Sequence, residues 1–160
     1  MTTEPMDVAA FLETRRAAIL AAAQEAVLRH SLAHYEADGT DVIGARLAAL
    51  FDVLVQCCRA HRVDPALRYG EELAVDRHAS GYGLAEVQTA VNVLEEAAWR
   101  SLTSEAPADA LGYALGLVST VLGAVKDRLA CTYVSQVSST PVHTLRLDSL
   151  FAGTEGSLPT

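Results

Sequence analysis

The 160-residue chain has few aromatic residues, which make up 6% of it, and only three cysteines. Aromatic and β-branched residues favour strands, whereas the abundant alanine and leucine favour helices, so this balance predicts an all-α protein. The three thiols lack the spacing of a metal site and fit a reducing compartment. A chain of this length can bury a core in one domain without metal or disulfide staples.

Positive charge is also scarce, because 12 Lys and Arg stand against 20 Asp and Glu, for a formal net charge of −8. This argues against sequence-independent binding to nucleic acid and to anionic membranes. The start, MTTEPMDVAAFLETRR, has acidic residues before its apolar stretch, the reverse of a signal peptide. The alanine-rich run at 17–23 is too short to span a bilayer. We therefore expect a cytoplasmic protein that binds neither nucleic acid nor membrane.

Apolar residues recur with helical periodicity and predict about five helices in a compact bundle. The third helix has the weakest apolar pattern, so we expect it at the edge of the core. From residue 138 onward, Ser, Thr and Gly predominate, which predicts a helical domain over 1–137 and a flexible tail over 138–160. The expected helices run from the Asp7 cap to about 35, from 40 or 41 to about 58, from 64 to near 80, from 84 to about 102, and from 107 to about 132.

The segment Gly81-Tyr82-Gly83 separates the third and fourth helices. It lacks the G-x-G-x-x-G spacing and a preceding strand, so we interpret it as a corner in which Gly81 is a left-handed helix cap. His78, just before the corner, has the position of a proximal histidine in a globin-like chain. A globin-like haem sensor that uses His78 is therefore the alternative function. Against it, the second helix offers no distal histidine, and a solvated or core-edge His78 is the competing interpretation.

His30 and His34 are one helical turn apart and could share a transition metal. Asp38 would be a third ligand only if the first helix continued to it, so we predict no metal site. Cys57 and Cys58 could form a vicinal disulfide, but we interpret them as small buried hydrophobic residues.

Acidic pairs stand at Glu71-Glu72 and Glu95-Glu96. Adjacent helical residues point about 100° apart, so these carboxylates do not face one another. No nucleophile–base spacing is present either. We therefore expect a protein that is not an enzyme and that holds no cofactor.

The fifth helix carries a second stripe, formed by Gly112, Gly116, Thr120 (or Ser119) and Gly123. Each interior glycine costs about 0.5–1 kcal/mol relative to alanine, so three in one helix need a reason. Small residues allow another helix to approach closely. That helix is either the first or second helix of the same chain or a helix of a second copy. We favour the homodimer, because one helix cannot easily bury both of its stripes within its own subunit.

The stretch YGEELAVDRHASGYGLAEVQTAVNVLEEAAW, residues 69 to 99, consists of a helix, a glycine corner with an aromatic residue, and Leu-x-Glu opening the next helix. Over about residues 33–136 the chain resembles the N-terminal domain of RsbRD-type regulators, the RsbT co-antagonist proteins of bacterial stress signalling. The resemblance implies a helical input module that acts through protein partners. Related stressosome proteins carry a globin-like module without haem. Family members often continue into an output domain, so we expect either a freestanding adaptor or a module of a longer protein.

Overall fold

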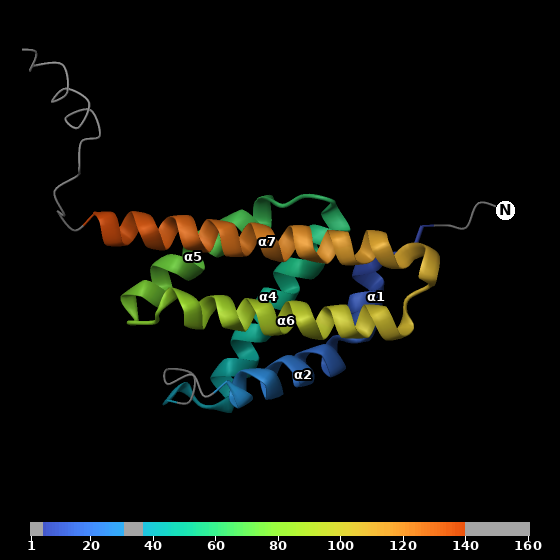
Figure 1. Cartoon of the computed structure of the whole chain (residues 1–160), viewed down its shortest axis with the longest axis horizontal. Helices are drawn as coiled ribbons and strands as arrows, with labels where there is room; N and C mark the ends of the chain where they lie inside the picture. The colour runs from blue at the N-terminus through green and yellow to red at the C-terminus, as the bar shows by residue number, and fades with distance from the viewer. Residues whose placement is uncertain (1–4, 31–36, 140–160) are drawn as a thin grey trace, which may run out of the picture.

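The structure is a computed structural model that describes residues 5–30 and 37–139. These residues form helices and no strand, which confirms the predicted all-α class (Figure 1). The predicted tail, 138–160, lies almost wholly outside the described residues. The helices are α1 (Val8–Thr14), α2 (Arg16–Arg29), α4 (Thr40–Ala60), α5 (Asp64–Ala79), α6 (Leu84–Glu105) and α7 (Ala108–Ser138).

The prediction of one continuous first helix is wrong. The chain forms two helices there, α1 and α2, which are separated at Arg15. The Asp7 cap is confirmed: the Ala10 amide donates to its carboxylate at 3.0 Å. Arg15 leaves helical geometry at φ −106°, ψ 10°, stacks on the Phe11 ring at 3.9 Å and pairs with Glu105 at 2.5 Å. No Pro or Gly marks the break, so no local signal predicts it. It directs α1 onto α4 and α2 onto both α4 and α6.

The remaining helices begin close to their predicted positions. Gly39, at φ 83°, precedes α4, and Pro107 precedes α7. Helix α5 begins at Asp64, as predicted, and Val63 is its cap residue. Helices α6 and α7 are joined by a short connection and run antiparallel, side by side, with α4 crossing them (Figure 1).

The six helices of the described residues share the core, and α5 contributes to it in an unusual way. Its buried residues are Ala66, Gly70, Ala74 and Arg77, none of them a large aliphatic side chain. A Cβ atom at Gly70 would lie 2.8 Å from the Val125 carbonyl oxygen of α7. The weak apolar pattern of α5 therefore reflects direct backbone approach. The largest fully buried side chains are Leu12, Ile19, Val27, Ile43, Phe51, Leu54, Val87, Val91, Leu94, Leu102, Leu122 and Leu129.

Candidate functional site

The glycine–tyrosine–glycine segment is a helix corner, as predicted. Gly81 has φ +81°, and its amide donates to the His78 carbonyl at 3.1 Å. The Tyr82 amide donates to the Arg77 carbonyl at 3.0 Å. This pair of bonds is the Schellman arrangement, in which a left-handed residue satisfies the last carbonyls of a helix. The corner thus fixes the position of Tyr82 relative to the end of α5.

Tyr82 is 6% exposed, so the corner points its ring inward. The guanidinium carbons of Arg46 and Arg77 lie 5.3 and 5.6 Å from the centroid of this ring. Nη1 of Arg46 donates to the Tyr82 hydroxyl at 2.6 Å. Two arginines from different helices, α4 and α5, therefore meet around one buried tyrosine.

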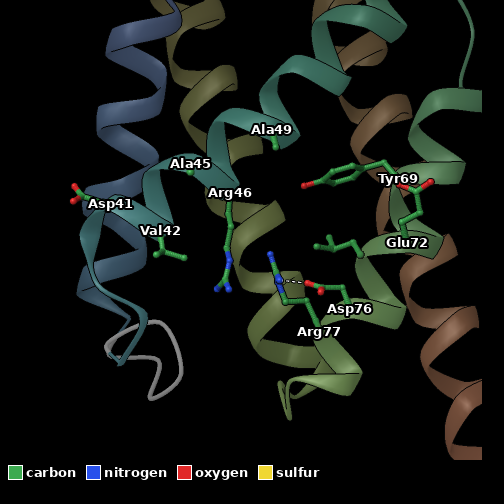
Figure 2. A pocket seen from close by; sticks show the side chains of 10 residues that line it. Asp41, Val42, Ala45, Arg46, Ala49, Tyr69, Glu72, Asp76 and Arg77 are labelled. Atoms are coloured by element: carbon green, nitrogen blue, oxygen red, sulfur yellow. Dashed lines mark hydrogen bonds and ion pairs between the residues drawn. The ribbon is translucent and has the colours of Figure 1, made fainter.

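The arginines open onto a groove of about 550 Å³ between α4 and α5, which we name the arginine groove. Figure 2 shows both side chains reaching into the gap between the helices, with Tyr69 extending from α5 toward α4. The volume is typical of a small-molecule site. The groove is lined by Asp41, Val42, Ala45, Arg46, Ala49, Tyr69, Glu72, Leu73, Asp76 and Arg77.

Among the described residues, both guanidinium groups keep hydrogen-bond donors that no acceptor uses. Arg46 pairs with Asp38, and Arg77 pairs with its neighbour Asp76, in each case through Nη1. Arg77 is only 9% exposed, and its Nε has no hydrogen-bond partner among the described residues. A buried donor without a partner costs about 1–3 kcal/mol, so Arg77 is in an unusual position for an arginine.

Tyr69 bears on what the groove can do chemically. Burial raises the pKa of its hydroxyl, and the nearby charges of Arg77 and Arg46 oppose this rise without cancelling it. The hydroxyl is therefore protonated at neutral pH and can donate a hydrogen bond but cannot act as a base. The groove offers donors and apolar walls, which suits binding better than catalysis.

Sequence reasoning missed these residues. Arg46 and Arg77 have the helical positions of ordinary surface charges. Arg77 is close to Tyr82 in the sequence, but Arg46 reaches that tyrosine from 36 positions away on another helix. The single available signal was the aromatic residue inside the glycine corner. A tyrosine between two glycines is held in place by the turn, and Tyr82 is the ring around which the arginines gather.

Two of the three candidate histidines are described, His30 and His78, and they lie at the ends of different helices. His78 is an exposed residue at the end of α5, with its ring centroid 5.7 Å from that of Tyr133, and it does not line the arginine groove. His30 is exposed, and its Nδ1 lies 2.7 Å from the Ala26 carbonyl oxygen. His34 lies outside the described residues. In the part of the chain that is described, no three His, Cys, Asp or Glu side chains are grouped for a metal.

The other polar candidates are separated as well. Glu95 pairs with Lys126 of α7 at 2.7 Å, whereas Glu96 pairs with Arg100 along α6 at 2.5 Å. These neighbouring carboxylates thus point in different directions, as their spacing predicted. Cys57 and Cys58 are buried free thiols, which confirms the interpretation of them as small core residues.

The glycine stripe of α7 is not packed against another described helix. Gly112, Gly116 and Thr120 are exposed and Gly123 is half-buried. A Cβ atom built on any of the three glycines would meet no atom of the described residues within 4 Å. The alternative in which the first or second helix of the same chain packs on this stripe is therefore wrong for the described residues.

Two aromatic residues flank this stripe. Trp99 of α6 is 42% exposed, and its indole nitrogen donates to the Ser119 hydroxyl beside the stripe at 3.1 Å. Tyr113 of α7 is 53% exposed. We name the surface formed by Gly112, Tyr113, Gly116, Thr120 and Gly123 the outer face of α7, with Trp99 at its edge.

Comparison with known proteins does not assign a family or a function to the chain. No protein-family model, characterised protein or solved structure matches the chain.

Proposed function

We propose that this protein is a non-enzymatic regulatory module that acts through protein–protein contacts, and that it forms a homodimer through the outer face of α7. The observation that carries the proposal is that this face consists largely of small residues, beside an exposed tyrosine and tryptophan, and that its three glycines meet no neighbour among the described residues. The resemblance to the N-terminal domains of RsbRD-type regulators supports a role in bacterial stress signalling. A cytoplasmic location agrees with both.

The composition of α7 explains why its outer face needs a partner. Its most apolar window has a mean hydropathy of 1.5, but only 28% of that window is buried. By length and composition α7 is the one described helix that could cross a membrane. Its inner face, however, places Val118, Leu122, Val125 and Leu129 in the protein core. We therefore assign the outer face to a helix of another protein molecule.

A second copy of this chain is the occupant that the surface fits. Trp99 projects beside a row of positions that lack side chains or carry small ones. A two-fold dimer requires one surface to hold both the projection and the recess that receives it. Tryptophan and tyrosine are also the residues that contribute most at protein interfaces. Trp99 of each copy would pack into the glycine stripe of the other.

Charges set the length of the contact. Asp109 and Asp127 are exposed and fall on the same side of α7 as the stripe, before and after its glycines. Like charges would repel if the two helices met along their whole length. We therefore propose a crossing centred between Gly116 and Thr120, with both aspartates left in water.

The test is the Gly116→Leu variant. We expect it to convert a dimer into a folded monomer, because a leucine blocks close approach by another helix, while its Cβ atom would meet no described atom of its own chain. Light scattering measures the mass, and circular dichroism measures the helix content. Ala22→Leu is the matched control, since it adds the same side chain to an exposed position of α2.

Several outcomes would contradict the proposal. A monomeric wild-type protein, or a dimer that survives Gly116→Leu, would remove the outer face as the interface. Recovery only in detergent would instead make α7 a membrane segment. A Soret band on haem addition that is lost in His78→Ala would favour the haem sensor.

A further inference from the structure

We propose that the arginine groove between α4 and α5 binds a small organic monocarboxylate with an apolar body. The inference does not rest on self-association through α7, because the groove is formed within one chain. It rests on three observations. The two arginines keep donors that no described residue uses, nearby carboxylates would repel a ligand of higher negative charge, and apolar side chains line the groove beside the arginines.

Both arginines have N–H donors that no described residue accepts from. Arg77 is nine-tenths buried, and its Nε has no partner among the described residues. Arg46 uses only Nη1 in hydrogen bonds with described residues. Both guanidinium groups are held against the Tyr82 ring, so little side-chain entropy remains to be lost on binding. The fork of an arginine matches the two oxygens of a carboxylate.

The surrounding charges favour a monoanion over a phosphate. Asp38 and Asp76 already pair with the two arginines, and Asp41 and Glu72 also line the groove or its edge. A doubly charged phosphate would meet these carboxylates at close range, where repulsion is weakly screened. A singly charged carboxylate uses the free donors with less repulsion.

The walls of the groove select the rest of the ligand. Val42, Ala45, Ala49 and Leu73 line it beside the arginines. A second, smaller cavity of about 20 Å³ shares Arg46, Tyr69, Leu73 and Arg77 with the groove and continues into the core. An apolar chain attached to the carboxylate can cover these walls, and burial of each methylene contributes about 0.8 kcal/mol.

The experiment is calorimetric titration of the full chain with three probes: hexanoate, hexanamide and inorganic phosphate. We expect saturable binding of hexanoate that is at least about tenfold tighter than that of the uncharged amide or of phosphate. The same titration on the monomeric Gly116→Leu variant should give an unchanged affinity, which separates this proposal from the dimer.

Two variants test the site from both helices. Arg77→Met removes the buried donors while keeping the aliphatic stem, and Ala45→Leu fills the groove from α4 while leaving both arginines in place. Each should weaken hexanoate binding by at least about tenfold. Arg68→Gln is the control, because Arg68 is an exposed arginine of α5 that does not line this groove.

The second variant protects the test against misfolding. Should Arg77→Met lower the melting temperature through loss of the Tyr82 contact, Ala45→Leu still reports on the groove, because Ala45 is exposed. The proposal is overturned if hexanoate shows no saturable binding up to about 10 mM, well beyond millimolar affinity. It is also overturned if phosphate binds more tightly, or if Ala45→Leu binds hexanoate as the wild type does.

Discussion

Gly70 of α5 and Gly116 of α7 are both glycines inside helices, and they have opposite surroundings. A Cβ atom at Gly70 would lie 2.8 Å from the Val125 carbonyl oxygen and 3.1 Å from Cβ of Arg128, whereas one at Gly116 would meet no described atom within 4 Å. The fold of a single chain therefore explains the first glycine and not the second. Gly116 weakens its helix without allowing close packing among the described residues, and the proposed homodimer would account for it.

The two sides of α7 extend this comparison. On the inner side, four aliphatic residues are fully buried and α5 is pressed against the helix backbone. On the outer side, a Cβ atom at Gly112, Gly116 or Gly123 would meet no described atom within 4 Å. The inner side accounts for the stability of the bundle, so changes on the two sides should have effects of opposite sign.

The largest effect is expected for Gly70→Ala. The new methyl group would push against a backbone oxygen of α7 that cannot move independently of its helix. We expect a loss of about 1–3 kcal/mol in the free energy of unfolding, which exceeds the gain from alanine's helix propensity. Urea denaturation in the Gly116→Leu background measures this without a contribution from association.

Gly44→Ala is the matched control for this prediction. Its methyl group would meet only the end of the flexible Gln24 side chain, at 3.4 Å. It should leave stability unchanged or slightly raised. Equal effects of the two alanines would mean that α5 and α7 do not approach as closely as the structure places them.

A smaller change of opposite sign is expected for Gly112→Ala. In the same monomeric background, the alanine meets no neighbour and removes the entropic cost of a helical glycine. The free energy of unfolding should rise by about 0.5–1 kcal/mol. Urea denaturation is again the measurement, and a decrease would show that the outer face is packed against this chain after all.

Much of the fold could be predicted, because its signals are local. Asp7, Gly39 and Gly81 mark helix ends by chemistry that acts within a few residues. The break at Arg15 could not be predicted, because its partner Glu105 is 90 positions away. Periodicity therefore located the helices but not the contact that divides one of them.

The candidate sites divide in the same way. The glycine stripe was visible because its members lie on one helix at regular spacing, although only the structure shows that it faces outward. The arginine groove could not be predicted from the sequence, because Arg46 and Arg77 come together around Tyr82 only when α4 packs near α5. A sequence pattern predicts which residues share one face of a helix, whereas this groove depends on how α4, α5 and the corner pack together.

The last prediction compares an exposed thiol of α7 with a buried thiol of α4, and it concerns reactivity rather than stability. Cys131 of α7 is exposed, while Cys58 of α4 is 3% exposed, and burial raises the pKa of Cys58 to about 12. At pH 8 its thiolate fraction is therefore about 10⁻⁴, so it should not react while the protein is folded.

Iodoacetamide at pH 8 should accordingly add one label per chain, at Cys131, as measured by mass spectrometry, and Cys131→Ser should add none. A label on Cys58 in the native protein would contradict the packing of α4 within the core. The rate at Cys131 should be equal in the wild type and in Gly116→Leu, because the proposed crossing ends before Asp127. Protection of Cys131 in the wild type alone would instead extend the interface along α7 beyond that aspartate.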